Sequence, residues 1–363
     1  MGETKLSTPV INLTRGMPPI ETFPTEALIR AAESALRNDS ATLLQYGRSP
    51  GYKPLRELLG GWYSVGPDQV LIGNSSLEIV DFIARTKLGL GKRAFVECPS
   101  YDRAITTFRR AGAEVVGIPL LGDGPDLGAM ERALKDGPPD LFYTVSDFQN
   151  PMGVTMSLAK RQQIATWAGQ YGFWVVEDAP YRSLRYWGQD VPTLYSLAPE
   201  RVFHLSSFSK TLAPGLRLGY AVATPQAIAE LAAFAVDTYI GPVFPSQGIV
   251  YEYCRAGLLE PNIEGLKALY APRLQATYQA LERYMPQATW SHPEGGFYVG
   301  VTLPEGVDMA DLMLRAAEAG VKLSDGRGFY PNPTDGNRFL RIPFCSVTPD
   351  DIFAGIARLA ELL

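Results

Sequence analysis

Short apolar runs alternate with longer amphipathic stretches over most of the chain. A short apolar run bounded by turn residues is typical of a buried strand, and apolar positions at helical spacing are typical of a helix. We expect strands at 69–72, 93–97, 114–118, 140–145, 173–177, 201–205 and 219–223. We expect helices before and between these strands, at 25–36, 54–62, 76–87, 102–111, 126–134 and 160–172. Thr25 is the expected N-cap of the first helix. Strands separated by helices in this way predict an α/β fold with a mostly parallel, doubly wound sheet.

The C-terminal part of the chain has a different pattern. Helices are expected at 225–238, 246–255, 261–284, 308–319 and 349–362, and short strands at 295–301, 321–323 and 338–342. A chain of 363 residues exceeds the usual size of one domain. We therefore predict a large domain over 31–265 and a small α+β domain over 266–363, joined by the long helix at about 261–284. Residues 1–30 are expected to pack with the small domain.

Composition and charge exclude several classes of function. The net charge of −5 disfavours non-specific binding to nucleic acid or to anionic membranes. Cys98, Cys254 and Cys345 are far apart, which predicts no disulfide framework and a reducing compartment. The N-terminus lacks the apolar core of a signal peptide and no apolar run reaches membrane length, so a cytoplasmic protein is expected. His204 and His292 are widely separated, so we expect no metal site.

Residues capable of chemistry cluster after the predicted strand at 201–205. Lys210 follows this strand, and burial would lower the pKa of its amine and make it a nucleophile. Ser207, Ser209 and Arg217 offer two hydroxyls and a guanidinium, a set that could hold a phosphate. An amine beside a phosphate site suggests pyridoxal 5′-phosphate (PLP) held as a Schiff base. The alternative is a strand end with a capping serine and a surface lysine.

Further polar residues follow other predicted strands. The turn at 73–76 opens a helix and could bind an anion, or its serine could simply be a cap. Tyr101 could lie against a flat cofactor or pack in the core, and Asn150 stands in an Asn-Pro-x-Gly turn. Asp178 ends an apolar strand and needs a cationic partner such as a pyridinium. Arg341 lies within an apolar strand, where a substrate carboxylate or an internal salt bridge could pair with it.

Together these motifs resemble the fold-type I PLP-dependent aminotransferases of class I/II. The resemblance covers the chain from about Asn12 to the C-terminus. Its motifs are Asn150-Pro-x-Gly, Asp178-x-x-Tyr181, Ser207-x-Ser-Lys210, Pro214-Gly-x-Arg217 and the late Arg341. The chain looks most similar to the group that contains 2-aminoadipate and kynurenine aminotransferases. This rests on the Arg15-Gly-Met-Pro loop, on Leu44-Gln-Tyr-Gly and on Pro293-x-Gly-Gly-Phe297.

The resemblance implies a catalytic centre of Lys210, Asp178 and Tyr181. Lys210 would form the Schiff base with PLP and then move the proton between Cα and the cofactor. Asp178 would keep the pyridine nitrogen protonated. Asn150 and Tyr181 would bind the 3-oxygen of the ring, on which Tyr101 would stack.

The resemblance also implies how phosphate and substrate are held. The phosphate would be bound by Ser75, Ser76, Ser207, Ser209 and Arg217, and by Tyr46 of a partner subunit. A homodimer with shared active sites is therefore expected. Arg341 would hold the α-carboxylate of the substrate, with Asn150 beside it, and Arg15 and Gly16 would border the substrate. Arg15 stands where many relatives have a small residue, so it could contact an acidic substrate side chain or merely a surface carboxylate.

The expected function is exchange of the amino group of an L-amino acid with a 2-oxo acid by ping-pong kinetics. Family analogy suggests 2-oxoglutarate as the acceptor, and a 2-aminoadipate, aromatic or branched-chain donor. Another PLP enzyme on this scaffold, such as a carbon–sulfur β-lyase or a decarboxylase, is the alternative. A non-catalytic ligand sensor is disfavoured because a pure binder needs neither Lys210 nor Asp178.

Overall fold

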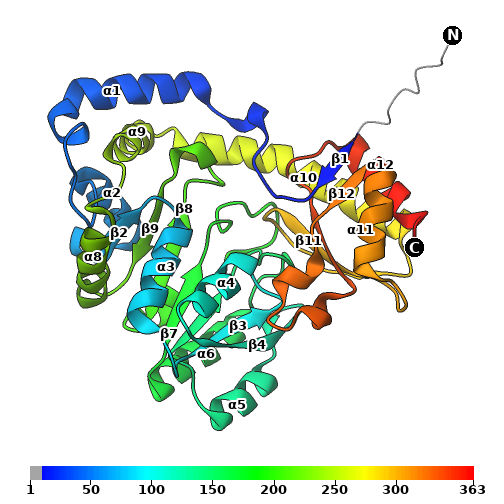
Figure 1. Cartoon of the computed structure of the whole chain (residues 1–363). Helices are drawn as coiled ribbons and strands as arrows, with labels where there is room; N and C mark the ends of the chain where they lie inside the picture. The colour runs from blue at the N-terminus through cyan, green and yellow to red at the C-terminus, as the bar shows by residue number, and fades with distance from the viewer. Residues whose placement is uncertain (1–9) are drawn as a thin grey trace.

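The computed structural model describes residues 10–363, which fold around an eight-stranded sheet (Figure 1). The strand order is β2-β9-β8-β7-β6-β3-β4-β5. The central strands from β4 to β8 run parallel, whereas β2, β9 and β5 pair antiparallel with their neighbours. The strands are β2 (Val70–Gly73), β3 (Arg93–Cys98), β4 (Glu114–Leu121), β5 (Gly124–Pro125), β6 (Leu141–Thr144), β7 (Trp174–Asp178), β8 (Val202–Ser207) and β9 (Gly219–Val222). The predicted α/β fold with a mostly parallel sheet is confirmed.

The central strands are apolar on both faces because helices cover both. Successive residues of a strand enter two separate core clusters, one on each face of the sheet. Phe142 of β6 and Val175 of β7 pack on one face, and Tyr143 and Val176 of the same strands pack on the other. The helices before and around this sheet are α1 (Thr25–Leu43), α2 (Lys53–Tyr63), α3 (Ser76–Lys87), α4 (Asp102–Arg110), α5 (Leu127–Asp136), α6 (Leu158–Tyr171), α7 (Leu194–Leu197), α8 (Pro225–Tyr239), α9 (Phe244–Arg255) and α10 (Leu259–Tyr284).

The first helix differs from its prediction at both ends. Thr25 does not cap it, because Pro24 holds the cap position and the Thr25 hydroxyl donates to the Phe23 carbonyl. The helix continues past residue 36 to Leu43 through a non-helical residue, Asp39. Packing of α1 against α9, together with a 2.9 Å hydrogen bond from the Tyr52 hydroxyl to the Asp39 carboxylate, supports this longer element.

A smaller α+β unit follows α10. Its antiparallel sheet has the order β10-β11-β13, formed by β10 (Thr289–Trp290), β11 (Tyr298–Thr302) and β13 (Phe339–Pro343). The predicted strand at 295–301 therefore starts three residues later, since Gly295–Phe297 lie outside β11. Helices α11 (Met309–Glu318) and α12 (Pro349–Ala360) complete the unit, and α12 packs on α10.

The start of the described chain lies beside this C-terminal unit (Figure 1). Strand β1 (Ile11–Leu13) pairs parallel with β12 (Val321–Leu323). This pairing supports the proposed packing of the N-terminal segment with a small domain. The first nine residues, to which the prediction of no signal peptide refers, lie outside the described part of the chain. Within residues 10–363, no helix is both long and apolar enough to cross a membrane, and no cluster of metal-ligating side chains occurs.

Candidate active site

A cavity of about 330 Å³ lies at the carboxyl ends of the central strands, where the sheet meets the C-terminal unit. Strand ends, the loop after β1 and strand β13 all contribute to its wall. All but one of the candidate residues from the sequence line it: Arg15, Gly16, Ser75, Ser76, Tyr101, Asn150, Asp178, Tyr181, Ser207, Ser209, Lys210, Arg217 and Arg341. Tyr46 is the exception, with an 83% exposed side chain outside the cavity.

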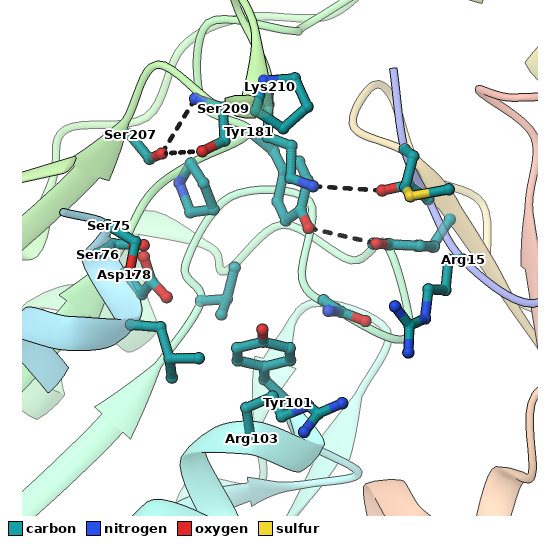
Figure 2. Close-up of a pocket in the computed structure, with 18 of the residues that line it drawn as sticks. Arg15, Ser75, Ser76, Tyr101, Arg103, Asp178, Tyr181, Ser207, Ser209 and Lys210 are labelled. Carbon is teal, nitrogen blue, oxygen red and sulfur yellow. Dashed lines mark hydrogen bonds between the residues drawn. The ribbon is translucent and has the colours of Figure 1, made fainter. Parts of the chain in front are cut away.

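Lys210 places the amine of this cavity just beyond the end of β8 (Figure 2). Its Nζ donates to the Gly16 carbonyl oxygen at 3.2 Å. The rings of Tyr181 and Phe297 lie 5.9 and 5.6 Å from the same nitrogen. A side chain at Gly16 would meet the ring of Tyr298 at 2.6 Å, so only glycine brings the backbone this close. The amine is thus held in a partly apolar wall that faces the cavity.

Asp178 is the last residue of β7 and is 5% exposed. Its Oδ2 accepts a 2.8 Å hydrogen bond from the Tyr143 hydroxyl, whereas its Oδ1 is buried without a partner among the described residues. Burial raises the pKa of Asp178 to about 6, against the lowering effects of the Tyr143 hydrogen bond and of electrostatic interaction with His204 and Lys210. A buried acceptor without a donor is costly, so this oxygen fits an N–H group of a ligand.

One part of the cavity wall, formed by Ser207, Ser209, Arg217 and the start of α3, is rich in groups that bind anions. The Ser207 hydroxyl donates to the Ser209 hydroxyl at 2.8 Å. Ser75 caps α3 through a 3.1 Å bond from the Glu78 backbone N–H to its hydroxyl, which leaves the first N–H groups of this helix at the cavity. A Cβ on Gly219 would lie 2.2 Å from the Ser76 nitrogen, so β9 and α3 approach closely here. With Arg217, these groups could hold a phosphate.

Arg341 projects from β13 and is 7% exposed. Its guanidinium lies 4.6 Å from the ring centres of both Tyr298 and Phe329. Its Nη1 donates to the Asn150 Oδ1 at 3.0 Å and its Nη2 to the Thr14 carbonyl at 2.7 Å. Its Nε is buried without a partner in the described chain, and no ion pair joins this arginine to a carboxylate there. The internal salt bridge considered above is therefore not formed, and the guanidinium is available to a ligand anion.

The lining residues that the sequence did not indicate include three with functional polar groups, Tyr143, Tyr298 and Arg103. Tyr143 lies in an apolar run, where a tyrosine resembles any core residue, and Tyr298 follows the glycine pair of an expected strand. Arg103 lies two residues after Tyr101, and that spacing is the one sequence signal that could have found it.

Comparison with known proteins assigns the chain to a family. Residues 8–359 match the family described as aminotransferase class I and II. The chain belongs to this family. The aminotransferase is 36% identical over 369 residues to aromatic-amino-acid aminotransferase 1 of Thermococcus litoralis, in an alignment that spans 98% of this chain and 88% of that relative.

Solved structures of similar aminotransferases share the whole fold. Kynurenine aminotransferase of Pyrococcus horikoshii matches with a TM-score of 0.94 and 35% identity, over 98% of this chain and 91% of that one. The α-aminoadipate aminotransferase of Thermus thermophilus matches with a TM-score of 0.92 and 32% identity, over 97% and 91%. The latter structure contains N-(5′-phosphopyridoxyl)-L-leucine, a conjugate of the cofactor with an amino acid. These matches confirm the predicted family, fold and subgroup.

The aminotransferase is a PLP-dependent enzyme, and the cavity fits that cofactor. The partnerless Oδ1 of Asp178 suits a protonated ring nitrogen. The polar groups around Ser209 and at the start of α3 suit the phosphate. Lys210 is the lysine in the described cavity wall, and its amine suits the aldehyde of the cofactor. The predicted cofactor and enzyme class are thus confirmed.

Proposed function

We propose that this aminotransferase exchanges the amino group of an L-amino acid with 2-oxoglutarate by a ping-pong mechanism. The observation that carries the proposal is the arrangement of three groups in one cavity. The Lys210 amine, the partnerless Asp178 Oδ1 and the Arg341 guanidinium all belong to residues that line this cavity, and Arg341 has no carboxylate partner in the described chain. These are an amine, an acceptor for a ring N–H and an anchor for a carboxylate. The aromatic, kynurenine and aminoadipate activities named for similar proteins keep the donor classes open.

When bound, PLP supplies an electron sink for the negative charge left on Cα after proton loss. Asp178 holds the proton on the ring nitrogen through its Oδ1. Arg341 orients the α-carboxylate, and the stacked rings of Tyr298 and Phe329 keep its fork in one position. Lys210 moves the Cα proton, because it supplies the primary amine of the described cavity wall. Asn150 and Tyr181, which also line the cavity, would bind the ring oxygen.

A single-turnover experiment tests the proposal. Purified holoenzyme mixed with one amino acid and no oxo acid should release one equivalent of the matching 2-oxo acid per subunit and then stop. Addition of 2-oxoglutarate should restart release and produce glutamate. Continuous release of ammonia with pyruvate would instead show a lyase, and release of CO₂ a decarboxylase. No reaction with any amino acid would favour a sensor.

We further propose a homodimer in which Tyr46 completes the phosphate site of the partner. Exposed apolar side chains gather around Tyr46: Leu44 is 70% exposed, Ile240 57% and Val243 52%. Such a patch is typical of a protein interface. The three free thiols support the cytoplasmic location expected from the sequence.

Replacement Tyr46→Phe should raise the Kd for PLP about tenfold, because one hydrogen bond to a charged oxygen is lost. Fluorescence titration measures this Kd, and sedimentation equilibrium should show a dimer for both proteins. Tyr171→Phe, at the distant end of α6, is the matched control and should leave the Kd unchanged. An unchanged Kd in Tyr46→Phe would remove the proposed contact, and a monomer would remove the dimer.

A further inference from the structure

Two arginines at the cavity mouth are not used by the roles proposed so far. The cations that line the cavity are Arg15, Arg103, Lys210, Arg217 and Arg341, and the anions are Asp102 and Asp178. The cofactor would engage Lys210, Arg217 and Asp178, and the α-carboxylate would engage Arg341. Arg15 and Arg103 remain, with only Asp102 to balance them.

Neither remaining arginine is strongly paired. The Arg15 side chain has no ion pair or hydrogen bond within residues 10–363. Arg103 has one contact, at 3.6 Å from its Nε to the carboxylate of Asp102, its neighbour in the chain. An exposed pair of this length contributes little energy, so a ligand can compete for the guanidinium.

The backbone that carries Arg15 is anchored on both sides of it. The Thr14 carbonyl accepts from Arg341 at 2.7 Å and the Gly16 carbonyl accepts from Lys210 at 3.2 Å. The Arg15 carbonyl itself accepts from the Ser346 hydroxyl at 3.4 Å. The backbone at Arg15 is therefore fixed between residues bonded to the proposed carboxylate anchor and to the Lys210 amine, and Arg15 lines the cavity there.

Arg103 lines the cavity from α4. It lies in the first turn of this helix, two residues after Tyr101, where the positive end of the helix adds to its charge. In Figure 2 the side chains of Arg15 and Arg103 come from two separate segments, the loop after β1 and α4, and Tyr101 lies beside Arg103. A substrate held at its α-carboxylate by Arg341 would extend its side chain into this region.

We infer that Arg15 and Arg103 form a second anion subsite, which binds an acidic group at the end of the substrate side chain. This inference rests on the proposed function, because it names the substrate class of the same site. The preferred donors are then amino acids whose side chain ends in a carboxylate or a phosphate. The same subsite would bind the distal carboxylate of 2-oxoglutarate in the second half-reaction.

The test compares donors in the first half-reaction alone, so that the acceptor does not contribute. Stopped-flow absorbance gives kcat/KM for glutamate, 2-aminoadipate, phosphoserine, glutamine and leucine. The wild type should prefer an acidic donor to glutamine or leucine, and the order among the acidic donors separates carboxylate from phosphate. Arg15→Gln and Arg103→Gln should each lower kcat/KM for the acidic donors about tenfold, mainly through KM, because each removes a charged hydrogen bond. The kcat/KM for leucine in both variants should stay within about twofold of the wild-type value, because a neutral side chain does not bind to these arginines.

A binding measurement adds a readout that is independent of turnover. Calorimetry should show that adipate binds the wild-type holoenzyme more tightly than valerate, and that both arginine variants lose this difference. Arg85→Gln is the matched control, since Arg85 is an exposed helical arginine paired with Asp81 away from the cavity. An equal fall in kcat/KM for leucine and for glutamate in the variants would overturn the proposed subsite. The absence of a preference for acidic donors in the wild type would overturn it as well. Failure of the wild type with every donor would instead overturn the proposed function.

Discussion

Lys210→Ala is expected to lower kcat for amino transfer about 10⁴-fold, the largest effect of any single replacement in this protein. Two functions are lost together, the covalent link to PLP and the proton transfer at Cα. Other cavity groups cannot replace the amine. A guanidinium is not a proton acceptor in proteins, which excludes the arginines of the cavity, and the phenol of Tyr181, whose pKa is raised by burial, is a poor base near neutral pH. Single-turnover absorbance with a good donor measures the loss.

Three comparisons separate a chemical role for Lys210 from a structural one. Added methylamine should restore part of the activity of Lys210→Ala, which a folding defect would not allow. Borohydride should fix PLP to a peptide containing residue 210 in the wild type and to no peptide in the variant. Lys160→Ala is the control, because Lys160 is a buried lysine that bonds the Gly124 carbonyl and Asp123 outside the cavity. Label at another lysine, or activity of Lys210→Ala within tenfold of wild type, would contradict the assignment.

The parts of the fold that follow from local pattern could be predicted from the sequence. Runs such as Trp174–Asp178 are buried on both faces of the sheet. In an α/β chain, a mostly apolar run that follows a helix is typical of a central strand covered by helices on both sides. Lys210 and Asp178 could be found because each places a charge at or just beyond the end of such a run. The edge of the sheet then brings them into one cavity with no further information.

Features that depend on distant contacts could not be predicted in this way. The pairing of β1 with β12 joins residues at opposite ends of the chain, and no local pattern encodes it. Asp39 reads as a helix end, yet tertiary packing with α9 continues the helix past it. Tyr143 is a core residue by pattern, and only the structure shows its hydroxyl on the Asp178 carboxylate. The same holds for Arg103, which the fold brings into the same cavity wall as Arg15 of the loop after β1.

Asp178→Asn is expected to lower kcat about 10²–10³-fold, the second largest effect, because the charge that holds the ring nitrogen protonated is removed. The same variant should stabilise the cofactor-free protein at pH 8. Burial raises the pKa of Asp178 from 3.8 to about 6, so the folded protein binds more protons than the unfolded chain between these values. The contribution of Asp178 to the free energy of unfolding is therefore fully present below pH 3.8 and is lost as the pH rises through 6. This loss lowers the free energy of unfolding by about 3 kcal/mol. Asparagine has no charge to bury, so urea unfolding at pH 8 should show a gain that disappears near pH 4.

Two further variants make this result specific to the ring partner. Tyr143→Phe removes a hydrogen bond that lowers the pKa of Asp178, so the acidic limb of kcat/KM should move to higher pH while Asp178→Asn loses that limb. Glu97→Gln is the control: Glu97 is also a buried carboxyl, with a pKa raised by burial to about 7, but it does not line the cavity, and its carboxylate accepts from the side chains of Thr144 and Gln149 and from the Val145 backbone N–H. It should gain stability at pH 8 and keep kcat within about threefold, since no charge at the reacting atoms changes. Equal losses of kcat in the two variants would show that any buried carboxyl matters to the fold, whereas a loss confined to Asp178→Asn ties the effect to the one oxygen that lacks a partner in the described chain.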